Sequence, residues 1–415
     1  MMKAPVQRLL GGPPIAAGME SFAEHLARLG PAPRGNAAMI STLEASGLLG
    51  RGGAGFPVGR KWRAVAERSD ARAVVLVNGA EGEPLSAKDR TLMTARPHIV
   101  LDGALLAAQS VGAEEVVLYV GSAHSGARAA LSRAMAERSS TGEGLATPPV
   151  RLVDAPARYV AGEETAAVHF VNEADARPTS LPPRPFERGV RGQPTLVQNV
   201  ETLAHAALIA RFGDGWYRRA GRGELRGTTL LTTTAAGRSV VVEVELGTTV
   251  AEVAAGIGES RESVHAVLVG GYFGGWLPID RAWSLGLDPH ELRGAGRALG
   301  CGVVSFLAND VCGVRATARI MEYMAGQSAA QCGPCVFGLR AIADATSRIA
   351  TGLGTSNDLE RIGRWVGQLA GRGACRHPDG AVGFLYSAMT VFGDEFAGHA
   401  RSRTCSRPRA LGRAA

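Results

Sequence analysis

The pattern of apolar residues changes twice along the chain, and these changes constrain the fold more than any single motif does. In the first half, short apolar runs alternate with amphipathic stretches; the runs include Ala73 to Val77, Glu115 to Val120 and Val150 to Asp154. Strands separated by helices in this way indicate an α/β domain with a largely parallel sheet. We therefore predict an α/β domain over residues 38–225, preceded by an N-terminal extension over residues 1–37.

The segments that follow have a different character. A segment rich in proline and arginine, Arg177 to Pro194, predicts a long ordered loop near the end of the α/β domain. Two strand-like segments, a short helix and a further strand then predict a small α+β domain over residues 226–308. Beyond it, apolar residues recur at helical spacing, which predicts a helical bundle over residues 309–398 and leaves a basic tail over residues 399–415.

The composition argues against two classes of protein. Hydrophobic residues make up 46% of the chain, yet no apolar run reaches the ~18 residues of a membrane-spanning helix. The net charge is +7, but five of the cations lie in the tail, at Arg401, Arg403, Arg407, Arg409 and Arg413. Because the body is nearly neutral, we predict no nucleic-acid partner and no direct membrane insertion. Glycine and proline at positions 11–14 interrupt any signal peptide, so we expect a cytoplasmic location.

All six cysteines lie after residue 300, which favours a local metal or redox function over a disulfide framework. Cys332 and Cys335 are spaced C-x-x-C and can share a metal, with Cys375 as a third ligand. The C-G-P-C sequence also occurs in dithiol exchange, but that chemistry needs a preceding strand, and a helical stretch from Ala316 to Gln327 stands there instead. A merely buried pair would leave Cys375 unexplained.

A glycine-rich segment runs from Gly50 to Trp62 and fits G-x-G-x-x-G at Gly50, Gly52 and Gly55. A dinucleotide-binding fingerprint of this kind must follow a strand, but a helical stretch precedes this segment, so we do not assign it as that fingerprint. The bare backbone can still approach a planar or phosphorylated ligand closely, and Lys61 is placed to meet a phosphate. The alternative is a flexible turn between helices.

Polar residues also follow the predicted strands or open the predicted helices. These are Asn78, Glu81 and Glu83, then Tyr159, Glu163 and Glu164, and finally Asn199. In an α/β sheet, ligands bind at the carboxyl ends of the strands, where such groups can hold a flavin edge or ribose hydroxyls. Each group also has a simpler interpretation, as a solvated acidic turn, as carboxylates favoured by a helix dipole, or as a helix cap.

Taken in this order, the segments resemble the NADH-binding flavoprotein subunit of respiratory complex I, the 51-kDa or F-type subunit, and the related diaphorase subunits of NAD-linked hydrogenases and formate dehydrogenases. The resemblance covers Gly47 to Phe396. It implies an α/β fold class with a Rossmann-like FMN- and NADH-binding domain, then a small β-grasp-like domain, then a C-terminal four-helix bundle that carries a [4Fe-4S] cluster.

The resemblance also implies a role for each candidate site residue. The residues around FMN would be Gly50, Gly52, Gly53, Lys61, Asn78, Glu81, Tyr159 and Asn199. The aromatic residues that flank the dinucleotide would be Phe56 and Phe186. The carboxylates near nicotinamide and ribose would be Glu83, Glu163 and Glu164, with Glu83 and Glu164 as catalytic residues. The cluster ligands would be Cys332, Cys335 and Cys375.

The activity implied is that of an NADH:acceptor oxidoreductase of the NADH dehydrogenase type. NADH would give a hydride to FMN, and single electrons would leave through the cluster to a small iron–sulfur partner, a ferredoxin or a thioredoxin-like [2Fe-2S] protein. The alternative is a non-catalytic binding or assembly subunit that keeps the fold without a complete redox centre.

Four positions depart from the family pattern, and one of them concerns the cluster. Ala80 stands where the family has an acidic residue, Gln198 where it has asparagine, and Ala64 where it has an aromatic residue. Ala329 replaces the first cluster cysteine. This loss favours a stand-alone paralogue over a complex I subunit. The fourth ligand would then be Ser328, His377 or Cys312, unless one iron stays open or the site holds zinc or nothing.

Overall fold

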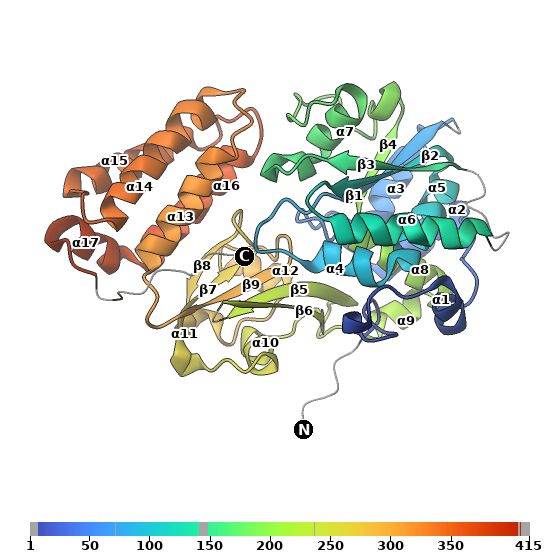
Figure 1. The fold of residues 1–415 in the computed structure, drawn as a ribbon, viewed down its shortest axis with the longest axis horizontal. Helices are drawn as coiled ribbons and strands as arrows, with labels where there is room; N and C mark the ends of the chain where they lie inside the picture. The colour runs from blue at the N-terminus through green and yellow to red at the C-terminus, as the bar shows by residue number, and fades with distance from the viewer. Residues whose placement is uncertain (1–6, 71, 141–147, 236, 406, 408–415) are drawn as a thin grey trace. The chain divides into compact units, whose positions relative to one another are not determined.

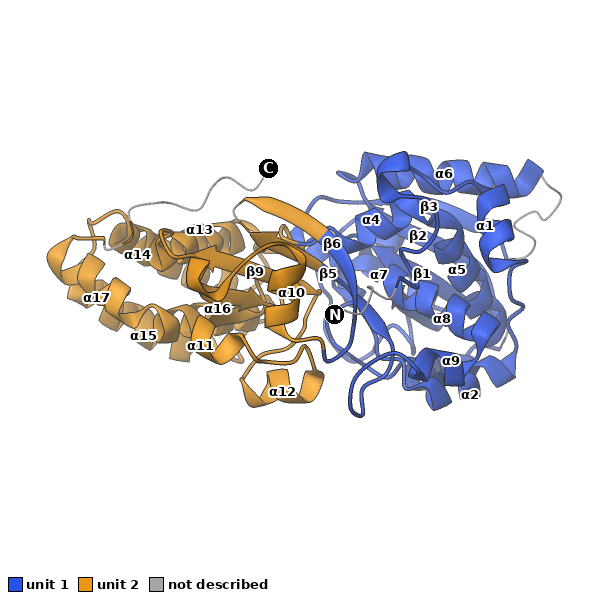
Figure 2. Ribbon diagram, turned by 90° about the horizontal axis from the view of Figure 1, so that it is seen from below, with its two compact units in different colours: residues 1–82, 86–231, 241–247 blue, residues 83–85, 232–240, 248–415 orange. Residues whose placement is uncertain are grey.

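The computed structural model describes residues 7–70, 72–140, 148–235, 237–405 and 407. They form two compact units, coloured separately in Figure 2. Unit 1 comprises residues 1–82, 86–231 and 241–247, and unit 2 comprises residues 83–85, 232–240 and 248–415. The tail residues Arg409 and Arg413 and the first six residues of the N-terminal extension lie outside the described residues.

Unit 1 is built on a four-stranded sheet in the order β3-β2-β1-β4, and every pair in it is parallel (Figure 1). The strands are β1 (Ala73–Gly79), β2 (Ala113–Gly121), β3 (Val150–Ala155) and β4 (Thr195–Asn199). The helices are α1 (Phe22–Leu29), α2 (Ala37–Ser46), α3 (Val58–Ala66), α4 (Lys88–Ala95), α5 (Pro97–Val111), α6 (Ser125–Ser140), α7 (Glu164–Glu173), α8 (Val200–Phe212) and α9 (Asp214–Arg218). The parallel α/β prediction is confirmed.

Alternate residues of β1 enter two separate cores, as the two-residue period of a strand requires. Ala73, Val75 and Val77 join a large core that includes residues of α2, α3, α5 and α8. Val74 and Leu76 join a second core with residues of α7. All five side chains are at most 1% exposed. This explains why the run reads as continuously apolar, since both faces of a parallel sheet are covered by helices.

Strand β4 was not predicted from the sequence. It lies directly after the loop predicted over Arg177 to Pro194. The prediction that Asn199 opens a helix is confirmed, because its side chain caps α8. In the structure β4 pairs with β1, and the register places Asn199 beside Asn78. The physical reason for the miss is that a five-residue strand buried against a neighbour carries almost no periodicity of its own.

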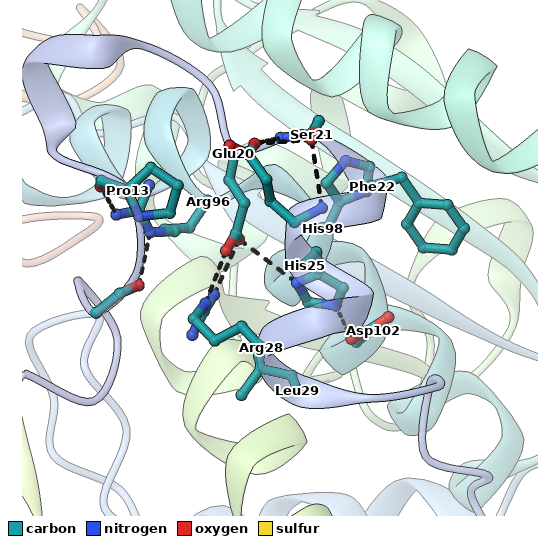
Figure 3. Close-up of polar contacts among 12 residues, drawn as sticks. Pro13, Glu20, Ser21, Phe22, His25, Arg28, Leu29, Arg96, His98 and Asp102 are labelled. Carbon is teal, nitrogen blue, oxygen red and sulfur yellow. Dashed lines mark hydrogen bonds and ion pairs between the residues drawn. The ribbon is translucent and has the colours of Figure 1, made fainter.

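The N-terminal segment is fastened to unit 1 by buried polar contacts (Figure 3). Ser21 caps α1, and His25 Nε2 lies 2.8 Å from Asp102 Oδ2 on α5. The carboxylate of Glu20 binds Arg28 through two oxygens, at 2.7 and 2.9 Å. Burial alone would raise the pKa of Glu20, but hydrogen bonds from His25 and Arg28 outweigh it and lower that pKa to about 2. The described part of the extension therefore packs on unit 1.

Unit 2 contains most of a mixed sheet and all of the C-terminal helices. The sheet order is β6-β5-β9-β7-β8, with β9 parallel to β5 and antiparallel to β7. The strands are β5 (Thr228–Ala235), β6 (Arg238–Glu245), β7 (Val264–Val269), β8 (Gly275–Pro278) and β9 (Val303–Ala308), with helices α10 (Val250–Gly256), α11 (Ile279–Ala282) and α12 (Pro289–Gly294). The boundary between the units falls within β5 and β6. This second sheet agrees with the predicted α+β module.

The last part of unit 2 is helical, as predicted. Its helices are α13 (Gly313–Gly326), α14 (Arg340–Ala350), α15 (Ser356–Leu369), α16 (His377–Val391) and α17 (Gly393–Ser402), with a π-helical turn, η5 (Pro334–Leu339), before α14. The four longer helices run alongside one another in Figure 1. None of the helices within the described ranges has both the length and the hydropathy needed to cross a membrane. The three-domain boundaries expected from the sequence stay a prediction.

Candidate functional site

A cavity of about 320 Å³ lies in unit 1 at the carboxyl ends of β1 and β4. It is lined by residues of four sequence segments: Gly50, Gly52, Ala54, Gly55, Phe56 and Lys61; Asn78; Gly162, Glu163 and Glu164; and Val197, Gln198 and Asn199. The chain passes from β1 to β2 on one side and later returns to β4 on the other, so the strand order reverses between β1 and β4. Such a switch point is where open α/β sheets bind ligands.

The glycine loop is held at its base and presents bare backbone to the cavity. Gly50 N donates to Phe56 O at 2.9 Å, and Val58 N donates to Leu48 O at 3.0 Å, which closes the loop. A Cβ added at Gly52 would lie 3.3 Å from the Cβ of Asn199, so a side chain there would crowd the cavity wall. The loop is a turn between α2 and α3 that leaves its backbone accessible to a closely approaching ligand.

Lys61, on α3, faces the acidic residues that open α7. Its Nζ lies 3.0 Å from Glu164 Oε2, and both side chains are about a quarter exposed. Glu163 caps α7 by accepting from the backbone N–H groups of Thr165 and Ala166, at 2.9 and 3.0 Å. Burial raises the pKa of Glu163, and these hydrogen bonds oppose the increase. The cavity therefore combines one cation with two carboxylates, which suits a ligand that carries both phosphate and hydroxyl groups.

Three amides meet where β1 and β4 end. Asn78 Nδ2 donates to Gly162 O at 2.8 Å, and Asn199 Nδ2 donates to Asp89 Oδ2 at 2.7 Å. Gln198 Oε1 is buried and has no hydrogen-bond partner among the described residues. An unpartnered buried acceptor on a cavity wall indicates that a ligand completes the site, because such an atom otherwise costs about 1–3 kcal/mol. In the sequence, Gln198 stands out only as a departure from the family pattern.

Behind Asn199 lies a buried charge network that the sequence did not reveal. Lys88 Nζ lies 2.7 Å from Asp89 Oδ1 and 2.8 Å from Glu201 Oε2. Burial alone would lower the pKa of Lys88, but the two carboxylates raise it. Burial raises the pKa of Asp89, and Lys88 opposes that increase. The network fixes the Asn199 side chain from behind. The scarcity of lysine in the sequence was the only available signal.

Five predicted site residues do not line this cavity: Gly53, Glu81, Glu83, Tyr159 and Phe186. Glu81 accepts from the backbone N–H groups of Asp89 and Arg90 at the start of α4. Phe186 packs against the large core of unit 1. Glu83 belongs to unit 2, where its carboxylate accepts from Tyr272 N at 2.8 Å. Their functional roles stay predictions.

The three predicted cluster cysteines belong to unit 2. Cys335 lies in η5, and π-helical turns occur frequently at functional sites. Burial raises the pKa of Cys335 to about 12; a hydrogen bond with Ser328 lowers it, and Cys332 and Cys375 raise it further. The Cys335 thiol therefore interacts with Ser328, Cys332 and Cys375. Metal binding would supply the deprotonation that such a buried thiol resists.

The structure separates the candidates for a fourth cluster ligand. Cys312 precedes α13, whereas the cluster cysteines follow its other end, and a helix of 14 residues is about 20 Å long. Cys312 is therefore excluded. His377 Nε2 lies 2.8 Å from Met324 O, which occupies one ring nitrogen. A hydrogen bond with Cys335 makes Ser328 a candidate, and His377 stays a candidate through Nδ1.

Comparison with known proteins identifies the family. A family model described as the Nuo51 FMN-binding domain matches residues 43–207, and one described as the NADH-ubiquinone oxidoreductase-F iron-sulfur binding region matches residues 315–399. The NADH-quinone oxidoreductase F 2 subunit of Rhizobium meliloti (strain 1021) is 31% identical over 378 residues, covering 88% of this chain and 90% of the relative. The chain belongs to the family of NADH-quinone oxidoreductase F subunits.

Another F subunit and a solved structure agree. The NADH-quinone oxidoreductase F subunit of Mycobacterium tuberculosis (strain ATCC 25618 / H37Rv) is 30% identical over 382 residues, covering 88% of this chain and 85% of the relative. A chain of the NAD+-reducing [NiFe]-hydrogenase in the H2-reduced state matches with a TM-score of 0.80 and 27% identity. That match covers 89% of this chain and 64% of the hydrogenase chain.

Membership of this family confirms the predicted fold and class of enzyme, an NADH dehydrogenase-type flavin oxidoreductase with an FMN-binding domain and an iron–sulfur binding region. The cavity residues fit a flavin, because the glycine loop, Lys61 and the unpartnered Gln198 oxygen offer the contacts that FMN requires. The matched iron-sulfur binding region, residues 315–399, contains Cys332, Cys335 and Cys375, whose roles as ligands stay predictions.

Proposed function

We propose that this chain oxidises NADH at FMN held in the cavity of unit 1, and that electrons leave through a cluster held by Cys332, Cys335, Cys375 and Ser328 to a small iron–sulfur protein. FMN, when bound, supplies the conversion of one hydride into two single-electron transfers. The chain supplies the placement of both redox groups and the electrostatics around them.

A single observation carries the proposal. Four segments that are distant in the sequence meet in one cavity at the carboxyl ends of β1 and β4. Each segment alone has a simpler structural interpretation, as a turn, a cap or a solvated carboxylate. Their meeting at a topological switch point, with a buried acceptor left open at Gln198, supports a ligand-binding role.

The cavity residues divide the work of binding by their chemistry. Gly50 and Gly52 allow the backbone to approach the flavin, and Lys61 neutralises part of the phosphate charge. Glu164, 3.0 Å from Lys61, holds the ammonium group in place. When FMN binds, the phosphate replaces Glu164 as the partner of Lys61. Phe56 is 50% exposed at the cavity, with the Arg60 guanidinium 6.0 Å from its ring centre, and offers a flat face for the dinucleotide.

The partner would dock beside Cys335. The next two side chains in η5, Val336 and Phe337, are 42% and 75% exposed. An exposed aromatic residue next to a redox centre suits a transient docking contact, where one anchor often carries much of the binding energy. The proposed partner is a ferredoxin or a thioredoxin-like [2Fe-2S] protein.

The flavin assignment can be tested by comparing FMN with riboflavin. Fluorescence titration of the apoprotein gives the affinity for each flavin. The proteins compared are wild type, Lys61→Met and the control Arg63→Met, which loses an ion pair between α3 and Glu44 of α2. We expect Lys61→Met to weaken FMN binding by about tenfold or more while riboflavin binding changes little, because a charge-assisted phosphate contact is worth ~1.5–3 kcal/mol. Equal losses for both flavins would contradict the proposed position of the phosphate.

The electron exit can be tested with two acceptors. Ferricyanide takes electrons without docking, whereas a [2Fe-2S] ferredoxin must dock. Phe337→Ala should lower the rate of ferredoxin reduction by about thirtyfold and leave ferricyanide reduction unchanged, since loss of an interface anchor costs ~2 kcal/mol. Iron and flavin analysis of the same preparation separates the alternatives: flavin without iron indicates direct transfer from FMN, and neither cofactor indicates an assembly role.

A further inference from the structure

A second group of potential metal ligands lies in unit 2, away from the cluster cysteines. The ligand atoms of Cys312, His399 and Cys405 all lie within 4.8 Å of one another, and Cys312 Sγ is 3.4 Å from His399 Nε2. Cys312 precedes the 14-residue helix α13 and the C-G-P-C motif follows it, so about 20 Å of helix stands between the two groups of ligands.

The histidine is held in the state that a metal ion requires. His399 Nδ1 lies 3.2 Å from the carbonyl oxygen of Ile349, and the side chain is 3% exposed. A carbonyl only accepts hydrogen bonds, so Nδ1 donates here, and Nε2 is the ring nitrogen left to bind a metal ion. Metal-binding histidines are commonly oriented by such a bond from the other ring nitrogen to a backbone carbonyl.

The two thiols reach this histidine from opposite directions along the chain. Cys312 caps α13 and is 0% exposed, and its sulfur accepts from Arg315 N at 3.4 Å. Burial raises the pKa of Cys312 to about 12 and the bond from Arg315 opposes that rise, so a bound metal ion would have to displace the proton. Cys405 follows α17, which ends at Ser402, and Arg403 turns the chain there in the left-handed conformation, with φ 55°. The chain is therefore folded back so that Cys405 meets Cys312.

We infer that Cys312, His399 and Cys405 bind one Zn²⁺ ion that ties the end of α17 to the start of α13. Two thiolates and one imidazole are the soft ligands that zinc prefers. Their combined charge of −2 neutralises the ion, so the occupied site can be buried without a net charge. A water molecule takes the fourth tetrahedral position beside the partly exposed Cys405. This inference is independent of the proposed redox function.

Metal analysis of the full chain tests the site. Wild type, Cys312→Ser, Cys405→Ser and the control Cys301→Ser are purified without chelators under reducing conditions, and zinc and iron are both measured. We expect about one zinc ion per chain in wild type and Cys301→Ser, and a decrease of about tenfold or more in the other two variants. Cys332→Ser should lose iron and keep zinc, which separates this site from metal bound by the cluster cysteines.

The spectrum of Co²⁺-loaded wild type tests the ligands without relying on a variant that folds poorly. Wild type stripped by a chelator and loaded with Co²⁺ should show a thiolate-to-cobalt charge-transfer band and visible bands of tetrahedral intensity, and Cys405→Ser should lose intensity in the charge-transfer band. Three results would overturn the inference: full zinc content in Cys405→Ser, no thiolate band in the reduced wild type, or a Cys312–Cys405 disulfide found after alkylation in freshly lysed cells.

Discussion

Replacing Lys88 by Met tests whether the buried charge network behind the cavity stabilises unit 1. The ammonium group is 2% exposed and lies 2.7 Å from Asp89 and 2.8 Å from Glu201. Met keeps most of the side-chain volume and removes the charge, so two carboxylates stay buried without their cation. Removing one partner from a buried ion pair costs about 3–5 kcal/mol, and 1 kcal/mol lowers Tm by ~2–4 °C in a domain of this size. We expect Tm to fall by roughly 6–20 °C.

Lys61→Met is the matched control, because it makes the same substitution in a half-buried pair. Lys61 and Glu164 are 25% and 28% exposed, so their ion pair is worth at most about 1 kcal/mol. Thermal unfolding of the two apoproteins, followed by circular dichroism, compares them directly. If Lys88→Met lowers Tm no more than Lys61→Met does, the buried charge network does not stabilise unit 1 more than a half-buried ion pair would, and the prediction is wrong.

The pH dependence gives a second check on the same variant. Burial raises the folded-state pKa of Asp89, and without Lys88 nothing from that ammonium opposes the increase, so the folded state of the variant binds more protons than the unfolded state. The free energy of unfolding of the variant therefore increases as pH falls. The difference in Tm between wild type and Lys88→Met should be smaller at pH 5 than at pH 8.

Three further predictions follow from other parts of the structure. Gly52→Ala places a methyl group on the cavity wall, 3.3 Å from the Cβ of Asn199, and should weaken FMN binding by about 5–150-fold for an overpacking cost of ~1–3 kcal/mol. Gly215→Ala, whose added methyl group meets no atom within 4 Å, should leave FMN binding unchanged. Glu20→Gln removes a carboxylate whose pKa is lowered to about 2, worth up to ~3 kcal/mol at pH 7. That stability is lost as pH falls from about 5 towards 2, so the free energies of unfolding of wild type and Glu20→Gln, measured in urea, should converge at acid pH. A difference between them that does not change with pH would contradict the role of Glu20. Ala329→Cys restores the missing cysteine and should raise the iron that survives aerobic gel filtration; unchanged iron would exclude that position from the site.

The elements that the sequence predicted well are those whose signal is local. The runs that became β1, β2 and β3 are apolar over most of their length, and the helices of the bundle repeat their apolar residues at helical spacing. The motifs were also visible, since the glycine loop and the C-G-P-C sequence are contiguous. Periodicity and composition are properties of a few neighbouring residues, so one chain is enough to read them.

Non-local pairing was invisible in the sequence. β4 has no periodicity to identify it, yet its register with β1 places Asn199 beside Asn78 and so creates the cavity edge. The burial of Lys88 against Asp89 and Glu201 is likewise visible only in the folded structure. A buried charge is recognised only by its partners, and the tertiary structure decides which partners it has.

The cysteines show the same division most clearly. By itself the sequence determined that a metal or redox function lies after residue 300, because all the thiols are there. The spacing and the family resemblance already grouped Cys332, Cys335 and Cys375, but only the tertiary structure placed Cys312 with His399 and Cys405. The reason is that a helix holds its two ends apart however similar the residues at those ends are, while a reversal of the chain brings distant ligands within bonding reach.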